Sequence, residues 1–322
     1  MISLTIGVTI FRDKKNYKLR TKFIKKAINS ILSQKFSKNI FIIVGNDNPD
    51  YPFHLSQIGV NSNKNIKILN RKKNLGEEKN MNDLLVKAKT KWFMWLADDD
   101  YLHKDFFKTI NGLKNINDCA AIYTNYFRLY DNKKIKKKKI NSEIIKINLS
   151  DFHKLFLSRK INLIGVYGII KKKLLIKIKG IKTLGDSYGP YSDSLIPLKL
   201  SRFGKIGYIN SKLVFFRIHN DSLSINNDYP AYYSAKSDFL KNYKDLKKYL
   251  PLNEYLTNIF YYNNWFINSI YEVLQRDNEK SLIYKIIIIG NLKRNLFVGY
   301  NLKFNFIIIL KIFKYILRII LK

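Results

Sequence analysis

Three aspartates, Asp98 to Asp100, follow directly after the apolar and aromatic run Trp92 to Ala97. A short continuous apolar run is typical of a strand buried on both faces, and open α/β sheets hold their ligands at the carboxyl ends of such strands. Adjacent carboxylates repel one another unless a cation or a set of hydrogen-bond donors lies between them. The cluster therefore indicates a ligand-holding strand end. The alternative is a solvated turn before a helix whose dipole favours acidic residues.

Composition predicts a globular protein of a reducing compartment. The chain has 322 residues, of which 46% are hydrophobic, enough for a large core and a smaller helical unit. The only cysteine, Cys119, excludes an intramolecular disulfide, so we expect a cytoplasmic protein. The amino terminus has no basic segment before its apolar stretch and is interpreted as a first strand. A net charge of +35 favours phosphates, anionic lipid or nucleic acid as partners.

Strand and helix patterns alternate through the first part of the chain. Strands are expected at 2–10, 40–44, 66–69, 92–97 and 120–127, and helices at 21–36, 74–89 and 104–113. This alternation predicts an α/β fold with a parallel sheet.

The regularity ends after residue 127. The basic run Asn132 to Lys139 is interpreted as a solvated hairpin tip. Residues 141–225 mix short strands and loops, and the chain becomes helical from about Tyr229. We therefore expect a first domain at 1–225 and a C-terminal helical region at 226–322.

Five motifs in order resemble the bacterial family 2 glycosyltransferases of the GT-A fold, of the type that makes surface polysaccharides. They are IGVTIFRD at 6–13, SILSQKF at 30–36, VGNDNPD at 44–50, NLGEEKNMN at 74–82 and LADDDYLHKDF at 96–106. The resemblance implies that 1–225 is a catalytic domain with a Rossmann-like, mixed, mostly parallel sheet flanked by helices. It also implies an inverting, metal-dependent enzyme of hexosyltransferase type. Such an enzyme moves a sugar from a nucleotide diphosphate sugar to a hydroxyl of a surface glycan or lipid-linked acceptor.

The resemblance places the donor nucleotide at the ends of the first strands. The residues it implies there are Thr9, Phe11, Asp47, Asn74 and Asp98. Phe11 offers a face on which a base can stack, and the Asp47 carboxylate can accept a hydrogen bond from the base. Asp47 could equally be a turn residue.

The loop after the first strand departs from the family pattern. Where many members have Pro-Thr-Tyr-Asn, this chain has Thr9-Ile10-Phe11-Arg12, and Asn46 stands at the first acidic position of the second loop.

The resemblance identifies the aspartate cluster as a metal site for Mn or Mg. The implied ligands are Asp99, Asp100 and His219, with Asp98 facing the sugar or ribose and Asp100 alternatively a helix cap. Hard cations prefer carboxylate and phosphate oxygens, and such an ion would neutralise the leaving diphosphate. Arg217, in the Arg-x-His segment, could pair with a phosphate or an acidic side chain.

The catalytic base is expected in the second half of the chain. In GDSYGPYSDSLIPLKLSRFGKIGYI, Asp193 matches the acidic residue that precedes an apolar helix and a Gly-Lys-Ile strand in the family. An inverting transfer needs one carboxylate to take the proton of the acceptor hydroxyl. Asp186 is the second candidate, and a helix cap is the structural alternative for either residue.

The C-terminal segment Lys303 to Lys322 predicts an amphipathic helix at a membrane surface. Lys311, Lys314, Arg318 and Lys322 fall within an arc of roughly 80° on a helical wheel. Burying such charges in a bilayer costs roughly 2.5–3.5 kcal/mol each, so the helix is expected to lie on an anionic surface rather than span it. We expect the protein at the inner face of the cell membrane. The alternative is a helix that docks its apolar face on protein.

Two other functions remain open. The basic and aromatic composition would suit a nucleic-acid-binding protein, but that function leaves the three aspartates unexplained, so no nucleic-acid partner is expected. A catalytically silent member acting within a glycan synthase complex is the second alternative, because the first-strand loop is altered.

Overall fold

The computed structural model describes residues 2–34, 39–61, 63–130, 142–185, 190–219, 228–276, 281–292 and 302–321. The chain forms two compact units, each discontinuous in sequence. We call Met1–Leu149, Asn162–Thr183 and Ser192–Ser222 the sheet unit, and Ser150–Ile161, Leu184–Tyr191 and Leu223–Lys322 the helical unit. The predicted division at 225/226 stays a prediction, and the predicted hairpin tip at 132–139 lies outside the described residues.

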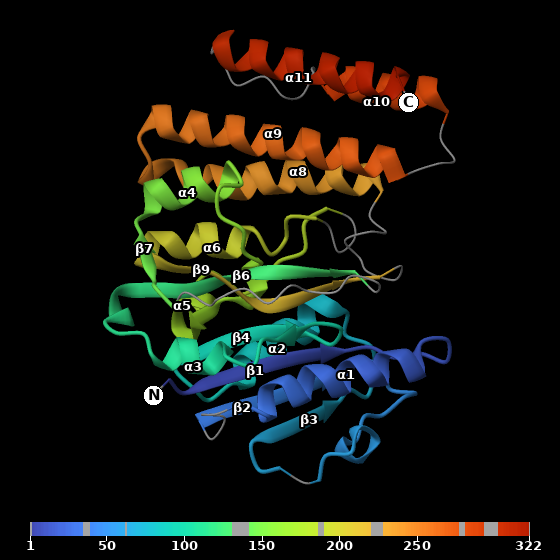
Figure 1. Cartoon of the computed structure of the whole chain (residues 1–322), viewed down its shortest axis with the longest axis vertical. Helices are drawn as coiled ribbons and strands as arrows, with labels where there is room; N and C mark the ends of the chain where they lie inside the picture. The colour runs from blue at the N-terminus through green and yellow to red at the C-terminus, as the bar shows by residue number, and fades with distance from the viewer. Residues whose placement is uncertain are drawn as a thin grey trace. The chain divides into compact units, whose positions relative to one another are not determined.

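A nine-stranded mixed sheet organises the sheet unit (Figure 1). Its order is β3-β2-β1-β4-β8-β6-β9-β5, and β7 pairs with β9. The strands are β1 (Leu4–Ile10), β2 (Ile40–Asn46), β3 (Ile66–Asn70), β4 (Trp92–Ala97), β5 (Tyr101–Leu102), β6 (Cys119–Tyr130), β7 (Ile145–Ile147), β8 (Ile169–Lys171) and β9 (Lys205–Ile218).

The first four strands are parallel and carry helices on both faces. Alternate residues of β1, β2 and β4 point into one core with α1 (Tyr17–Leu32) and α3 (Phe106–Asn111). The other face of β1 and β2 packs against α2 (Glu77–Lys87). Two-sided cover explains why β1, β2 and β4 are apolar along most of their length.

Glycine lets α2 approach the sheet closely. A Cβ on Gly45 would lie 2.5 Å from Oδ1 of Asn80 and 3.0 Å from Cδ2 of Leu84. The Asn80 amide donates to the Gly45 carbonyl oxygen at 2.9 Å, and Oδ1 of Asn80 accepts from the Arg71 guanidinium. Asn80 is therefore held in place and has little freedom to move aside.

The second half of the sheet is less regular, and it makes the sheet mixed. The predicted strand at 120–127 extends to Tyr130 as β6, and its parallel partner β9 is 14 residues long, longer than the short strands expected there. Between β4 and β6, β8 runs antiparallel to both. The sheet unit also holds α5 (Lys172–Lys177) and α6 (Leu195–Leu200), whereas α4 (Leu149–Leu157) lies in the helical unit from Ser150 onward. The predicted mixed, mostly parallel sheet flanked by helices, with a C-terminal helical region, is confirmed.

Aromatic residues fill the core of the helical unit. Its helices beyond α4 are α8 (Tyr229–Lys244), α9 (Leu252–Arg276), α10 (Leu282–Asn291) and α11 (Leu302–Ile320). The rings of Phe239 and Tyr262 stack at 4.0 Å, and Tyr191 meets Trp265 edge to face at 4.9 Å. Within the described part of the chain, no helix is both long and apolar enough to cross a membrane.

The close approach at Gly45 gives a stability prediction. Gly45→Ala should lower the free energy of unfolding by about 1–3 kcal/mol, because the added methyl overpacks the contact with α2. Urea denaturation measures the change. Gly112→Ala is the control, since its Cβ would meet only atoms at 3.4 and 3.5 Å. An equal loss in both variants would contradict the packing argument.

Candidate functional site

The predicted donor and metal residues lie at one edge of the parallel sheet. Thr9, near the end of β1, pairs in register with Gly45 of β2 and Ala97 of β4. Asp47 follows β2 and Asp98 follows β4. Since the carboxyl ends of parallel strands share an edge, the fold brings these side chains into one region.

Asp98 and Asp99 share one cation from α1. The Arg20 guanidinium donates to Oδ1 of Asp98 at 2.9 Å and lies 3.4 Å from Oδ2 of Asp99. Burial, followed by the neighbouring charge of Asp99, raises the pKa of Asp98 to about 7, although Arg20 opposes the shift. Burial and the charge of Asp99 therefore outweigh the opposing effect of Arg20 on the pKa of Asp98.

Asp99 also receives two groups from the end of β9. Nε2 of His219 lies 2.9 Å from Oδ2 of Asp99, the oxygen that faces Arg20. Arg217 donates its Nε–H to the Asp99 backbone carbonyl at 2.9 Å. Its guanidinium also lies 4.2 Å from the ring centre of Phe23 on α1. The Arg-x-His segment thus meets the aspartate cluster from a strand far along the chain.

Asp100 is directed into the protein. The Tyr167 hydroxyl donates to Oδ2 of Asp100, and the Arg217 backbone N–H donates to Oδ1 at 2.6 Å. Asp100 is buried, and desolvation followed by the charge of Asp99 raises its pKa well above the ordinary value. Both of its oxygens therefore take part in internal hydrogen bonds.

The donor set fits a divalent cation in part. Among the described residues, no group of three or more His, Cys, Asp and Glu side chains is gathered closely enough to hold a metal ion. Asp99 and His219 do stand together. The carboxylate suits Mn or Mg, with phosphate oxygens to complete the shell, whereas an imidazole is the less usual ligand for these hard ions. A cation would also relieve the repulsion between the adjacent carboxyl groups of Asp98 and Asp99. The metal ligands stay predictions, with Asp100 separated from the other two by its internal partners.

Two of the predicted nucleotide residues, Asp47 and Asn74, lie in loops that a hydrogen bond connects. Asp47 is buried, and its Oδ1 accepts the Leu75 N–H at 2.8 Å. The exposed Asn74 accepts the Gly76 N–H through its side chain at 2.8 Å. Phe11 is 44% exposed, so its ring is accessible. Asp47 therefore ties the loop after β3 to the end of β2.

Arg12 is a residue that sequence reasoning missed. It is fully buried, and its guanidinium donates to Oε1 of Gln57 at 3.1 Å and to the Tyr51 and Pro52 carbonyl oxygens at 3.1 and 3.0 Å. It also lies over the Tyr17 ring at 4.7 Å. Burial lowers the pKa of Arg12. Arg12, which departs from the family pattern, thus joins the loop after β1 to the loop after β2 through its guanidinium.

Asp193 lies just before α6 and is half-buried. Its Oδ2 accepts the Gly165 N–H at 2.8 Å, and Ser194 donates its hydroxyl to Oδ1 at 3.3 Å. A Cβ on Gly165 would lie 1.9 Å from the Asp193 carbonyl oxygen, so only glycine allows this approach. Asp186, the second candidate base, lies outside the described residues.

One short turn connects the candidate base to the aspartate cluster. The 3-10 turn Gly165–Tyr167 holds Asp193 through the N–H of its first residue and Asp100 through the hydroxyl of its last. Neither Tyr167 nor Arg20 was singled out from the sequence. Arg20 lies near the start of a helix that follows the first strand, which is a usable signal, whereas a tyrosine in an irregular segment gives none.

Comparisons with known proteins bear on the family and the fold of the chain. The family model described as Glycosyl transferase family 2 matches residues 16–178, just over half of the chain. The match ends before Asp193, Arg217 and His219. A search of the curated proteins gave no match.

Solved structures show the same fold. The crystal structure of S. aureus TarS 1-349 has a TM-score of 0.58 at 14% identity, covering 92% of this chain and 81% of that one. The TarS 1-349 structure in complex with UDP-GlcNAc gives a TM-score of 0.59 at 14% identity, covering 92% and 82%. At this identity the likeness shows the fold alone, and the predicted GT-A-type fold is confirmed.

The internal partner of Asp100 gives a second stability prediction. Tyr167→Phe should lower the free energy of unfolding by about 1–3 kcal/mol, because it leaves a buried carboxylate oxygen without its donor. Tyr208→Phe is the matched control: this buried hydroxyl has only neutral partners, with acceptor oxygens at 3.3 and 3.4 Å and the Asn162 N–H, which donates to it at 3.4 Å. Its loss should stay below about 1 kcal/mol. Urea denaturation measures the free energy of unfolding of both variants. A greater loss of stability for Tyr208→Phe than for Tyr167→Phe would contradict the importance of the Tyr167 hydrogen bond to Asp100.

Proposed function

The chain belongs to glycosyl transferase family 2, and on that premise we propose that it is an inverting, metal-dependent glycosyltransferase. It moves a sugar from a nucleotide diphosphate sugar to a hydroxyl of a surface glycan or lipid-linked acceptor. The observation that carries this proposal is the convergence of Arg20 and His219 on Asp99, where β4 ends. UDP-GlcNAc in the TarS complex supports the donor class.

The donor side of the proposal uses the loops after β1, β2 and β3. The exposed Phe11 ring offers a stacking face for the base. Asp47 accepts a hydrogen bond from the base while it also holds the Leu75 N–H. Thr9 and Asn74 complete the nucleotide contacts from the neighbouring strand end and loop.

The negative charge of the leaving diphosphate is neutralised at the aspartate cluster. Asp99 and His219 would hold Mn or Mg, and the ion would supply positive charge to the departing diphosphate. Asp98 faces the donor sugar or ribose. Arg20 already donates to both carboxylates and is equally able to donate to phosphate oxygens. Asp100, bound to Tyr167 and the Arg217 N–H, keeps the loop in position.

Asp193 is the proposed base. Gly165 and Ser194 each donate a hydrogen bond to its carboxylate, and these two contacts fix its orientation. In the reaction, Asp193 takes the proton of the acceptor hydroxyl as that oxygen forms a bond to the anomeric carbon. The bond between that carbon and the diphosphate oxygen breaks on the opposite face, which inverts the configuration.

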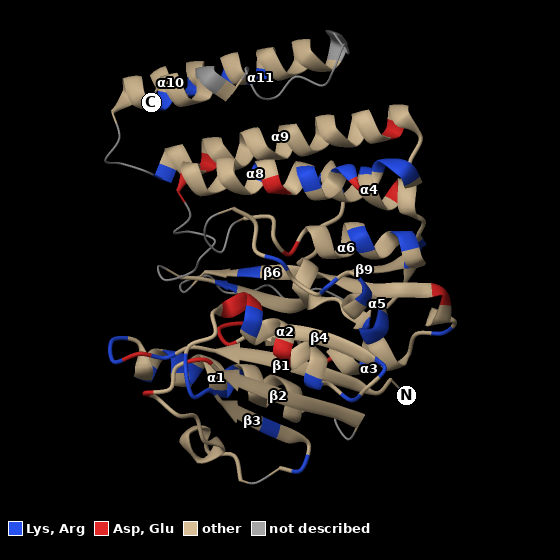
Figure 2. Cartoon of the chain, turned by 180° about the vertical axis from the view of Figure 1, so that it is seen from behind, with Lys and Arg blue, Asp and Glu red and all other residues tan. Residues whose placement is uncertain are grey.

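We further propose that this enzyme is cytoplasmic and works at an anionic membrane surface. The support is the net charge of +35 and the distribution of Lys and Arg over elements of both units (Figure 2). A lipid-linked acceptor would be found at such a surface. A nucleic-acid-binding function gives no role to the aspartate cluster, so we do not favour it.

Nucleotide binding tests the donor site. Nucleoside diphosphates with Mn should raise the melting temperature of the wild type, because a ligand at one hundred times its Kd adds about 2.7 kcal/mol of stability. Asp99→Asn should abolish this shift. Asp118→Asn is the control, since Asp118 pairs with Lys146 and Lys205 at the surface. No stabilisation of the wild type by any nucleotide, with Mn or Mg, would overturn the proposed donor site.

Turnover tests the base. Asp193→Asn should lower kcat with the identified donor by about 10²- to 10⁴-fold, because general base catalysis contributes that much. Its nucleotide-dependent melting shift should stay at the wild-type value, which controls for folding and donor binding. Undiminished turnover would contradict the role of Asp193. Nucleotide binding without turnover in the wild type would favour the catalytically silent partner.

A further inference from the structure

The last helix turns its polar side chains inward. In α11, Lys311 donates from Nζ to the carbonyl oxygen and Oδ1 of Asn264 on α9, at 3.1 and 3.2 Å. Tyr315 donates its hydroxyl to Asn268, and its ring stacks on that of Tyr271 at 4.1 Å. A helix that packs on a soluble protein normally presents its apolar stripe to the core. In α11 these polar residues contact α9 as well, alongside apolar contacts such as the stacking of Phe304 on Phe260 at 4.3 Å.

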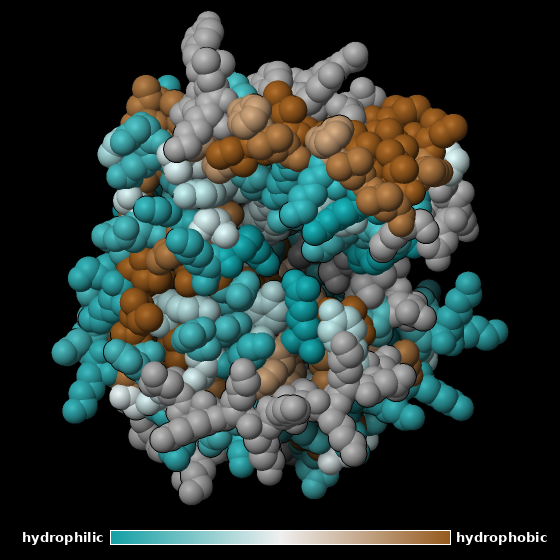
Figure 3. Space-filling view, turned by 45° about the horizontal axis from the view of Figure 1, so that its top comes forward, coloured by the Kyte–Doolittle hydropathy of each residue, from teal (hydrophilic) through white to brown (hydrophobic). Residues whose placement is uncertain are grey.

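Only a narrow apolar stripe of α11 is buried, and the rest of its apolar surface faces outward. The buried large residues are Ile308, Ile312 and Ile319. Large apolar side chains that are exposed on α10 and α11 are Leu282, Ile283, Ile287, Phe306, Ile307, Ile309, Leu310, Phe313, Leu317 and Ile320. Figure 3, in which these helices come forward, shows the hydrophobic surface gathered over them. We call this set the apolar face.

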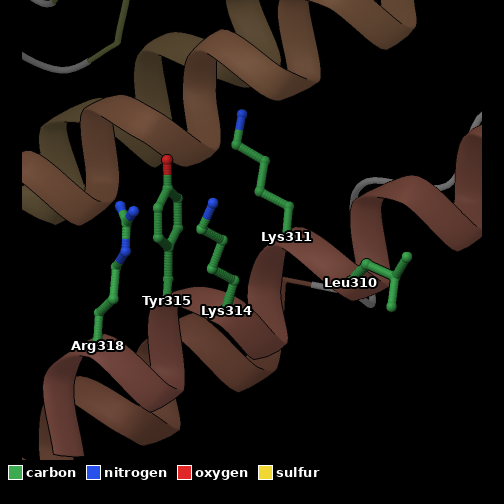
Figure 4. A pocket seen from close by; sticks show the side chains of 5 residues that line it. All are labelled: Leu310, Lys311, Lys314, Tyr315 and Arg318. Atoms are coloured by element: carbon green, nitrogen blue, oxygen red, sulfur yellow. The ribbon is translucent and has the colours of Figure 1, made fainter. Parts of the chain in front are cut away.

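A basic pocket lies beside the apolar face. It has a volume of about 320 Å³ and is lined by Leu310, Lys311, Lys314, Tyr315 and Arg318. Figure 4 shows the three cations and the tyrosine extending to the same side of α11, whereas Leu310 points away from them. No acidic residue lines the pocket. Burial, followed by the charge of Lys314, lowers the pKa of Lys311 to about 8.

We propose that the apolar face inserts into an anionic bilayer leaflet and that the basic pocket holds the headgroup phosphate of an anionic phospholipid. This inference rests on the proposed membrane-surface function and is independent of the donor chemistry. When one side of a helix enters the acyl chains of a leaflet, cations on the opposite side of that helix lie at the level of the lipid phosphates. The pocket therefore stands where a phosphate would be.

Charge selects the lipid over a second copy of the chain. Two copies that met through this face would bring together two pockets of three cations each, in molecules that each carry +35. Like charges brought together at an interface oppose association. An anionic leaflet offers negative charge and an apolar layer together, which match the pocket and the apolar face.

Vesicle binding by the full chain tests the pocket. We would compare sedimentation with phosphatidylcholine vesicles and with vesicles containing phosphatidylglycerol. The double variant Lys314→Gln/Arg318→Gln should weaken binding to the anionic vesicles by about 25-fold, taking about fivefold for each basic residue. Lys247→Gln/Lys248→Gln is the control, because it removes the same charge from an exposed turn of the helical unit. An equal loss in both variants would overturn the headgroup site.

A second pair of variants tests the apolar face. Phe306→Ser/Phe313→Ser should reduce vesicle binding at least tenfold, since these side chains are 60% and 59% exposed. Val86→Ser/Leu252→Ser removes apolar side chains of similar exposure, 65% and 57%, from α2 and α9 and should leave binding unchanged. If the vesicles bind the phenylalanine variant as well as the wild type, insertion through this face is wrong.

Further measurements distinguish the anionic lipid from two other possible occupants, a soluble anion in the pocket and a second copy of the chain on the apolar face. If inorganic phosphate stabilises the wild type but not the pocket variant, and vesicles do not bind, the pocket takes a soluble anion and the lipid proposal fails. If the wild type sediments as a dimer that Phe306→Ser/Phe313→Ser dissociates, and vesicles do not bind, the face joins two copies. Nucleotide melting shifts on the same samples report the donor site. Their absence with intact vesicle binding would overturn the transferase proposal alone.

Discussion

The structure around the candidate site depends on one constraint: three adjacent carboxyl groups, Asp98 to Asp100, lie largely buried in the short loop between β4 and β5. Arg20 contacts Asp98 and Asp99, and His219 contacts Asp99, while Asp100 takes neutral donors. These partners come from α1, from the turn Gly165–Tyr167 and from the end of β9. Three distant parts of the chain are therefore required to hold the loop between β4 and β5. The repulsion that makes the cluster costly is also what would attract a cation, and a bound cation would in turn attract a diphosphate.

The two sides of the site are held by different chemistry. On the proposed donor side, Arg12 joins two loops through neutral oxygens and aromatic rings, and Asp47 holds a third loop by a backbone N–H. On the proposed acceptor side, Asp193 is oriented by Gly165 and Ser194. The turn Gly165–Tyr167 contacts both Asp193 and Asp100, so a change in the turn would reach both the proposed base and the aspartate loop.

The helical unit shows a second use of charge. Lys311 in α11 is held by the α9 amide Asn264, and Lys314 and Arg318 line the same pocket, while large apolar side chains of α10 and α11 remain at the surface. Exposed apolar area of this kind is unfavourable in water. Together with a basic pocket it is the pattern expected of a helix that lies in a membrane interface. The sequence predicted the cationic arc of this helix, and the structure shows which way the arc faces.

The sequence by itself determined the alternating strands and helices and the strand end that carries Asp98 to Asp100, because local hydrophobic period and propensity are enough to specify these. The same pattern predicted a parallel sheet, and β8, antiparallel to both of its neighbours, makes it mixed. The family resemblance implied an apolar helix and a strand after Asp193, where α6 and β9 lie. Only the tertiary structure decided that Arg20, Tyr167 and Arg12 are the partners that hold the site, and that Asp100 bonds to Tyr167 and to the Arg217 N–H. Partners that lie as many as 120 residues apart are chosen by packing and by the need to satisfy buried polar groups, and neither leaves a local pattern in the sequence.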